Sequence, residues 1–239
     1  MEEEAMPIGV FVNTVAIALG GIAGASWGSR LSAAFKEKLQ QVFGICAMGI
    51  GITSVILMAN LPAVILSLIL GTILGIALHL GERIERGGAA MAKLFPAGEG
   101  SRDTALLVTA IVLFCASGTG IYGSIVSGIS DDHSILLAKS VLDLFTAMIF
   151  ACSLGMVVSA IAIPQFVIFL ALYLLAKVIF PLTTPEMISD FKACGGLILL
   201  ATGLRIAKIR DFPIADMIPA MLIVWPVSWM WTTWIVPLL

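Results

Sequence analysis

The stretch that decides the fold is Ile135–Ile161, ILLAKSVLDLFTAMIFACSLGMVVSAI, an apolar run that contains one lysine and one aspartate. A helix of about 20 apolar residues crosses the roughly 30 Å hydrocarbon core of a bilayer, and this run is longer. A Lys or Asp at the centre of such a helix costs about 2.5 to 3.5 kcal/mol on insertion scales. Lys139 and Asp143 are four residues apart, so a helix places them on one face. The pair predicts a polar pathway or a ligand site inside a membrane span.

Composition supports a membrane protein independently of this stretch. Hydrophobic residues make up 60% of the chain and charged residues 12%, and the mean hydropathy is +1.10. These values lie far from those of a soluble domain. The net charge of −2 gives no indication of a nucleic-acid partner, and the four cysteines lack metal-ligand spacing. We expect the lipid bilayer as partner, no nucleic acid, no cofactor and no metal.

Apolar runs predict an all-α, polytopic helix bundle that forms a single membrane domain over residues 1–239. The acidic start, MEEEAM, lacks the basic region of a cleaved signal peptide, so the first span is expected to be retained. We expect about eight spans, with seven as the alternative because the sixth and seventh contain prolines and charges. The expected spans are Ile8–Ser29, Val42–Ala59, Pro62–Leu80, Ala105–Gly128, Ile135–Ile161, Gln165–Phe180, Cys194–Leu204 with its flanks, and Ile214–Trp234.

The basic residues gather in alternate loops of this eight-span arrangement. Because Lys and Arg are enriched in cytoplasmic loops, this pattern predicts that both termini lie outside the cytoplasm. Residues 81–103 form the largest hydrophilic stretch, which we expect to be a cytoplasmic loop with a short interfacial helix. Ten of the 13 basic residues follow the pattern: Arg30, Lys36, Lys38, Arg83, Arg86, Lys93, Arg102, Arg205, Lys208 and Arg210.

Glycines recur at helical spacing in several spans. Gly20, Gly24 and Gly28 are four residues apart in the first span, and Gly71 and Gly75 are four apart in the third. Small residues at this spacing let helix backbones approach closely. They predict tight packing, either within the chain or in a homo-oligomer joined through these faces.

The fourth span is too rich in glycine to be an ordinary helix. Its segment Ser117–Ser124 reads SGTGIYGS, and each interior glycine costs about 1 kcal/mol of helix propensity relative to alanine. We predict a broken helix whose unwound part supplies backbone and hydroxyl groups to a solute or ion. A flexible, closely packed helix end is the alternative. The candidate ligands in this segment are Ser117, Gly118, Thr119, Gly120 and Ser124.

The fifth span carries the charged part of the candidate site. Lys139, Ser140, Asp143 and Thr146 share one broad stripe, and Asp143 lies about 13 Å along the helix from Ser134. Asp143 is the strongest candidate because a lysine near the outer half of the membrane can extend to the headgroups. Asn13 in the first span is a further deep polar residue, for which we predict an interhelical hydrogen bond.

Several phrases of the chain resemble a known family. They are Asn13-Thr14, Leu113–Gly123, Ala138–Gly155, and the region from Leu182 through Gly195-Gly196 to Arg205. Together they resemble the membrane family known as domain of unknown function 554, the YqgA-like proteins, from about residue 7 to the C-terminus. The resemblance implies a transporter of the bacterial inner membrane, and it implies neither a substrate nor catalytic residues.

The sequence therefore favours a small secondary transporter or permease for an ion or small polar solute, and not an enzyme. Asp143 would bind a cation or proton, with Lys139 as its counter-ion. An ion channel with the same polar groups is the first alternative. A non-catalytic assembly or sensor protein is the second, although it leaves the buried pair unexplained.

Overall fold

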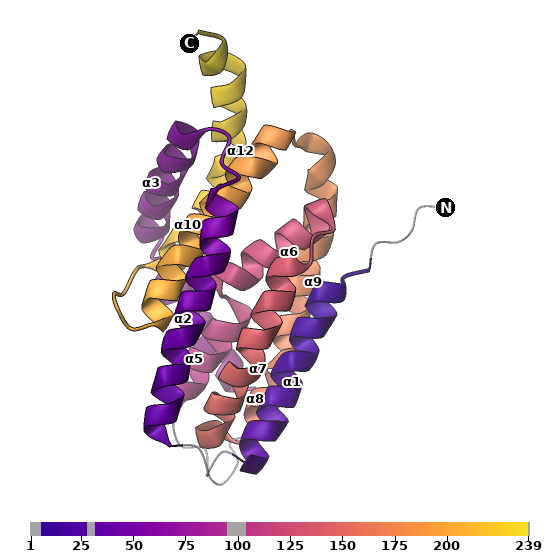
Figure 1. Ribbon diagram of the computed structural model, residues 1–239, viewed down its shortest axis with the longest axis vertical. Helices are drawn as coiled ribbons and strands as arrows, with labels where there is room; N and C mark the ends of the chain where they lie inside the picture. Colours follow the sequence, from indigo (N-terminus) through magenta and orange to yellow (C-terminus); the bar gives the residue numbers. More distant parts are fainter. Residues whose placement is uncertain (1–5, 28–31, 95–103, 239) are drawn as a thin grey trace. The chain divides into compact units, whose positions relative to one another are not determined.

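The computed structural model describes residues 6–27, 32–94 and 104–238, and within these ranges the protein is helical (Figure 1). The all-α, polytopic class predicted from the sequence is confirmed. The α-helices are α1 (Ile8–Trp27), α2 (Ala33–Val55), α3 (Leu61–Ala77), α4 (Leu80–Ala92), α5 (Thr104–Cys115), α6 (Gly118–Ser130), α7 (Ser134–Leu154), α8 (Val157–Ala160), α9 (Ala162–Ile179), α10 (Pro185–Ile206), α11 (Ile214–Met217) and α12 (Ala220–Met230). Shorter helical turns are η2 (Phe180–Leu182), η3 (Trp231–Ile235, a π-helical turn) and η4 (Val236–Leu238).

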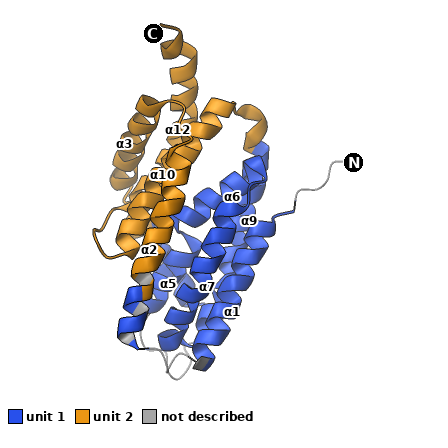
Figure 2. Ribbon diagram, in the orientation of Figure 1, with its two compact units in different colours: residues 1–38, 84–178 blue, residues 39–83, 179–239 orange. Residues whose placement is uncertain are grey.

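The chain separates into two compact units that interleave along the sequence (Figure 2). Unit 1 comprises Met1–Lys38 and Ile84–Val178, and unit 2 comprises Leu39–Arg83 and Ile179–Leu239. Of the eight predicted spans, unit 1 contains the first, fourth and fifth and nearly all of the sixth. Unit 2 contains the second, third, seventh and eighth.

Unit 1 is built around the pair α1 and α7, which lie side by side (Figure 1). Gly20 and Gly24 of α1 face the backbone of α7, where a side chain at either position would collide with the carbonyl oxygen of Leu144 or Met148. The absence of a side chain therefore permits the close approach that the glycine spacing predicts. Around this pair lies a buried apolar core: Ile17, Ala92, Leu107, Ala110, Ile111, Phe114, Cys115, Ala147, Ala151, Leu154, Val158, Ile161 and Ala162.

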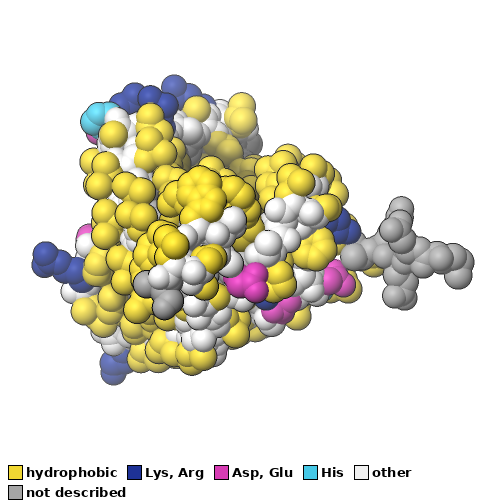
Figure 3. Space-filling model, turned by 90° about the horizontal axis from the view of Figure 1, so that it is seen from above, with side chains coloured by type: hydrophobic (Ala, Val, Ile, Leu, Met, Phe, Trp, Pro, Cys, Tyr) yellow, Lys and Arg dark blue, Asp and Glu magenta, His cyan; other side chains and the backbone are white. Residues whose placement is uncertain are grey.

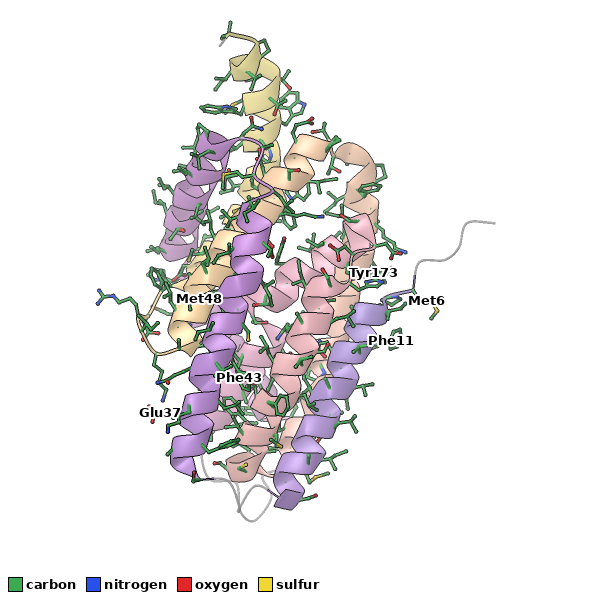
Figure 4. All side chains as sticks on the ribbon, viewed as in Figure 1. Met6, Phe11, Glu37, Phe43, Met48 and Tyr173 are labelled. Atoms are coloured by element: carbon green, nitrogen blue, oxygen red, sulfur yellow. The ribbon has the colours of Figure 1, made fainter. Side chains whose placement is uncertain are left out.

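In unit 2, glycines likewise permit close approach at two helix contacts. Gly71 and Gly75 of α3 face the backbone of Ala220 and Asp216, which belong to α12 and α11. Gly51 of α2 similarly meets the backbone of α10. The glycine faces that suggested a homo-oligomer are thus covered by helices of the same unit, while the homo-oligomer itself stays a prediction. Gly28 lies outside the described residues. Phe43 and Met48 mark α2 in Figure 4.

The ends of the helices follow local sequence signals. Thr184 caps α10 by accepting a hydrogen bond from the Met187 N–H, and Pro185 occupies its first turn. Gly155 ends α7 with φ of 72° and ψ of −153°, a conformation essentially restricted to glycine. The predicted fifth span, Ile135–Ile161, is therefore too long. Val157–Ile161 belongs to the next span, which runs from Val157 to Leu182 instead of Gln165–Phe180.

Within the described residues, six spans are long and apolar enough to cross a membrane, or seven if a bent pair is counted as one. The expectation was about eight. The bent pair is α3 with α4, whose axes differ by 58° at a break near His79, which has a positive φ. The predicted second span, Val42–Ala59, lies largely on α2, which is a helix but is not among the six because its first half is polar. The predicted sixth and seventh spans both pass, so their prolines and charges do not shorten them below the required length.

Large apolar side chains are exposed along the outer faces of these helices. On α1 they include Phe11, Val15 and Leu19, and on α3 Ile65, Ile69 and Ile73. The view in Figure 3 shows a surface made mainly of hydrophobic side chains, with charged groups in small clusters. Lipid is the solvent that suits such a surface. The short helix expected within residues 81–103 corresponds to α4, and its position at an interface stays a prediction.

Candidate functional site

The ion pair predicted on the fifth span is formed on α7. The ammonium of Lys139 donates to both carboxylate oxygens of Asp143, at 2.8 Å to Oδ1 and 2.7 Å to Oδ2. Both residues are buried, with exposed fractions of 4% and 6%. The i, i+4 spacing on a regular helix places the two charges together, as expected. The interaction joins a positive and a negative charge away from solvent, where the low dielectric strengthens their attraction.

Asn13 of α1 joins the pair from a different helix. Its Nδ2 donates to Asp143 Oδ2 over 2.9 Å, so the predicted interhelical hydrogen bond is confirmed. Asn13 is fully buried. The close approach of α1 to α7 at Gly20 and Gly24 brings these two side chains within reach.

Two further polar residues extend this contact into a chain. Gln165 of α9 donates from Nε2 to Asn13 Oδ1 over 3.0 Å, and its Oε1 lies 2.9 Å from the hydroxyl of Thr14. That hydroxyl lies equally 2.9 Å from the carbonyl oxygen of Val10. We call Thr14, Gln165, Asn13, Asp143 and Lys139 the polar chain. It connects α1, α7 and α9 in unit 1.

The predicted ligands on the fourth span are arranged differently from the expectation. The span is broken, as predicted, but only at Ala116–Ser117, and Gly118–Ser130 is the α-helix α6. The prediction that Ser117–Ser124 is unwound is therefore wrong. The cap explains why the glycines do not unwind it, because the Ser117 hydroxyl accepts a hydrogen bond from the Gly120 N–H over 3.1 Å. Tertiary packing adds to this, since a side chain at Gly120 would collide with Phe169.

The remaining predicted residues lie on α6 and α7. Ser124 donates to the Gly120 carbonyl over 2.7 Å, and Ser140 donates to the Leu136 carbonyl over 2.6 Å. Gly118 and Thr119 are buried in the first turn of α6, and Thr146 is half-buried on α7. Of the ten predicted site residues, hydrogen bonds thus bring Asn13, Lys139 and Asp143 directly together. A role in binding for the others stays a prediction.

Sequence reasoning missed Gln165. The sixth span was expected to begin at this residue, where an amide ordinarily faces the headgroups. The span begins earlier, at Val157, which places Gln165 inside the bundle with no exposed surface. The signal was the isolated glutamine in an apolar run, and it could have been found by extending the span across Pro164.

A second buried carboxylate, Asp190 of α10, was also missed. Its Oδ1 accepts hydrogen bonds from the backbone N–H groups of Ala59 and Asn60, at 3.0 and 2.7 Å. Its Oδ2 accepts from Asn60 Nδ2 at 3.0 Å and from the Ser228 hydroxyl at 2.6 Å. These four neutral donors fill the acceptor positions of a carboxylate. Asp190 thereby ties the turn before α3 to α10 and α12 within unit 2.

The helices, their apolar surfaces and the buried polar residues define a multi-pass helical membrane protein. Comparison with known sequences identifies the family. The family model for a protein of unknown function, DUF554, matches residues 8–229, and the chain belongs to this family. No solved structure matches the chain.

Two relatives cover nearly the whole chain. An uncharacterized protein of Escherichia coli K12, YqgA, is 48% identical over 235 residues, which are 96% of this chain and 99% of the relative. An uncharacterized membrane protein of Bacillus subtilis 168, YdfK, is 28% identical over 221 residues, or 90% of this chain and 93% of the relative.

Proposed function

We propose that the protein is a small secondary transporter or permease for an ion or small polar solute, with Asp143 as its cation- or proton-binding group. The observation that carries the proposal is the polar chain inside unit 1. Buried polar and charged side chains are costly within a membrane, and they commonly mark pathways for ions and solutes. If the polar chain served only to hold the helices together, uncharged side chains could form such hydrogen bonds at a lower cost of burial than a lysine and an aspartate.

The ion pair supports a binding role for Asp143 in particular. The Lys139 ammonium lies at the end of a flexible side chain of four methylene groups. It can therefore withdraw from Asp143 without unfolding α7. If it withdraws, Asp143 keeps one neutral donor, Asn13, and needs another positive partner. In the described conformation Lys139 fills that place, so we interpret it as the closed state of the site.

The cellular setting is part of the proposal. We propose that the chain lies in a bacterial cytoplasmic membrane with both termini outside the cytoplasm. The support is the sequence pattern of Lys and Arg, which alternates from loop to loop. A directional transporter requires one fixed orientation in the membrane.

Flux measurements in reconstituted liposomes test this function. We expect the protein to move protons or alkali cations, detected with a trapped pH-sensitive dye and with ion-selective electrodes. Asp143→Asn should abolish the flux in protein that still folds as a helical bundle by circular dichroism, although its thermal unfolding midpoint falls because the Lys139 ammonium loses its partner. Asp211→Asn, a matched change at an exposed aspartate paired with Arg205, should retain the flux. Undiminished flux in Asp143→Asn would refute the assigned role.

The same liposomes distinguish a carrier from a channel. A carrier shows saturable flux and accelerated exchange when substrate is present on both sides. Conductance that rises linearly with ion concentration, without exchange, would identify a channel with the same polar groups.

A further inference from the structure

The polar chain has a direction, which follows from the hydrogen-bonding capacity of each group. Asp143 is paired with an ammonium and acts as an acceptor, so Asn13 must present its NH₂ group to it. Asn13 Oδ1 then faces Gln165, which must present its own NH₂ group. Gln165 Oε1 consequently faces Thr14 and takes the hydroxyl proton. Reversing either amide alone would place two acceptors or two donors against each other.

The hydroxyl of Thr14 is the variable end of the chain. It has one proton and two acceptors at the same distance of 2.9 Å, Val10 O and Gln165 Oε1. When the proton points to Gln165, the chain runs as described above. When the proton points to Val10, the hydroxyl oxygen is free to accept a hydrogen bond from Gln165.

A second complete arrangement follows if both amides reverse together. Thr14 donates to Val10 O and accepts from Gln165 Nε2, and Gln165 Oε1 accepts from Asn13 Nδ2. Asn13 Oδ1 then faces Asp143 Oδ2. Every donor and acceptor between Thr14 and Asn13 is satisfied again, and two oxygens now face each other. Two facing oxygens require a positive charge between them.

We propose that Thr14, Gln165 and Asn13 form a reversible hydrogen-bond chain that lets Asp143 exchange the Lys139 ammonium for another cation, with Asn13 Oδ1 as an additional ligand. The inference rests on the proposed function and specifies its ligand. The incoming cation is a proton or an alkali metal ion, because both bind between two oxygens. A proton forms an O–H group on Asp143 that donates to Asn13. An alkali ion is coordinated by Asp143 and Asn13 together.

Other titratable groups lie on helices that pack on α7 and belong in the same test. Among the helices that pack on α7, α5 contributes the thiol of Cys115, which interacts electrostatically with both Lys139 and Asp143. Helix α6 contributes Tyr122. The described residues of α1 and α8 contain no Asp, Glu, Lys, Arg or His. Any response to pH must therefore be assigned to Asp143 by substitution.

Side-chain amide spectroscopy tests the reversal directly, because the chain has only two asparagines and three glutamines. The full-length protein is labelled with nitrogen-15 on these side chains and placed in lipid nanodiscs. It is titrated with acid in one arm, and with NaCl or KCl replacing choline chloride in the other. We expect the amide signals of Asn13 and Gln165 to shift together with one midpoint. Asn60, which binds Asp190, and exposed Gln41 serve as internal controls and should not follow that midpoint.

Three variants complete the experiment. Asp143→Asn should remove the joint shift. Thr14→Val should weaken cation binding by about fivefold to tenfold, because it leaves a buried N–H of Gln165 without an acceptor in the reversed chain, which costs more than the unpaired Gln165 oxygen that it leaves in the original one. Thr14→Ser keeps the hydroxyl and should restore the wild-type midpoint.

The outcomes separate this inference from the proposed function. A shift of Asn13 without Gln165, or equal midpoints for Thr14→Val and Thr14→Ser, would overturn the chain and leave Asp143 as the binding group. Unchanged amide signals would do the same if Asp143→Asn still abolishes flux. If Asp143→Asn leaves both flux and spectra as in the wild type, the proposed function fails as well.

Discussion

Asn60 donates its side-chain amide to Asp190 over 3.0 Å in unit 2, across 130 residues of sequence. Asn13 donates in the same way to Asp143 in unit 1, over 2.9 Å and also across 130 residues. One shift of 47 residues (60 less 13, and 190 less 143) relates the two pairs, and it also carries Gly24 to Gly71. In unit 1 the buried carboxylate of Asp143 thus binds the glycine-bearing helix α1, and in unit 2 that of Asp190 binds the turn before the glycine-bearing helix α3.

The two carboxylates differ in their other partners. Asp190 accepts from four neutral donors that are fixed in place, two of them backbone groups. Asp143 instead depends on the flexible Lys139 for two of its hydrogen bonds. A site that must release and rebind a charge needs a partner that can leave. This difference favours Asp143 as the binding group and Asp190 as a structural tie.

The buried ion pair predicts a non-additive pattern of stability. Lys139→Met should lower the free energy of unfolding by about 3 to 5 kcal/mol, because it leaves the Asp143 charge buried without its partner. The double variant Lys139→Met/Asp143→Leu should be more stable than Lys139→Met alone, since both charges are removed. Thermal unfolding in a mild detergent measures both. A double variant that is less stable than either single variant would contradict this account.

Asp190 should be important for stability even though it is assigned no transport role. Asp190→Leu leaves two backbone N–H groups, an amide and a hydroxyl without their acceptor, and should cost at least about 3 kcal/mol. Glu186→Gln, an exposed change on the same helix, should change stability by less than about 0.5 kcal/mol. Denaturation midpoints of the two variants decide the matter. Equal midpoints would show that the four contacts contribute nothing.

Glycine substitutions should divide according to what each glycine faces. Gly24→Ala places a methyl group against the Met148 carbonyl of α7 and should destabilise the protein by about 1 to 3 kcal/mol. Gly49 of α2 has open space around it. Gly49→Ala should therefore be neutral or stabilising by up to about 1 kcal/mol through helix propensity. The comparison requires only unfolding temperatures, and the reverse order would disprove the packing of α1 on α7.

The boundary between α7 and α8 depends on one backbone conformation. Gly155→Ala should destabilise the protein by about 1 to 3 kcal/mol, because the residue occupies a region essentially open only to glycine. Asparagine tolerates the usual left-handed region but not this one, so Gly155→Asn should fail to restore stability. A wild-type unfolding midpoint for Gly155→Asn would indicate a different backbone at this position.

Orientation in the membrane can be tested on the C-terminus. A reporter enzyme that is active only outside the cytoplasm should be active when fused after Leu239. The same reporter inserted after Leu94, which follows α4, should be inactive. Activity at Leu94 together with inactivity at the C-terminus would establish the opposite orientation.

The sequence predicts the parts of this structure that depend on composition and local spacing. Hydropathy identifies the helices, the i, i+4 rule identifies Lys139 with Asp143, and the glycine spacing identifies the close helix contact of α1. The helix limits were less predictable, because an apolar run continues through Gly155, whose unusual φ and ψ values end α7. That shift of boundary in turn concealed Gln165.

Long-range partners are the other information that the sequence could not supply. Asp190 weakened the predicted seventh span because a lone carboxylate is unfavourable there. Its actual environment comes from Asn60 and Ser228, on other helices. The helicity of α6 was underestimated for a related reason. Intrinsic helix propensity predicts helices only weakly, and the packing of Phe169 against Gly120 outweighs the low propensity of glycine.

The interleaving of the two units has a consequence for biosynthesis. Asn13 leaves the ribosome 130 residues before Asp143, and at roughly 5 to 20 residues per second this separation lasts about 7 to 26 s. During that interval α1 has neither its carboxylate nor the helix that covers its glycines, and Asn60 waits equally long for Asp190. Both polar contacts can therefore form only after most of the chain has been made, so α1 and the turn at Asn60 remain without their final partners during most of synthesis.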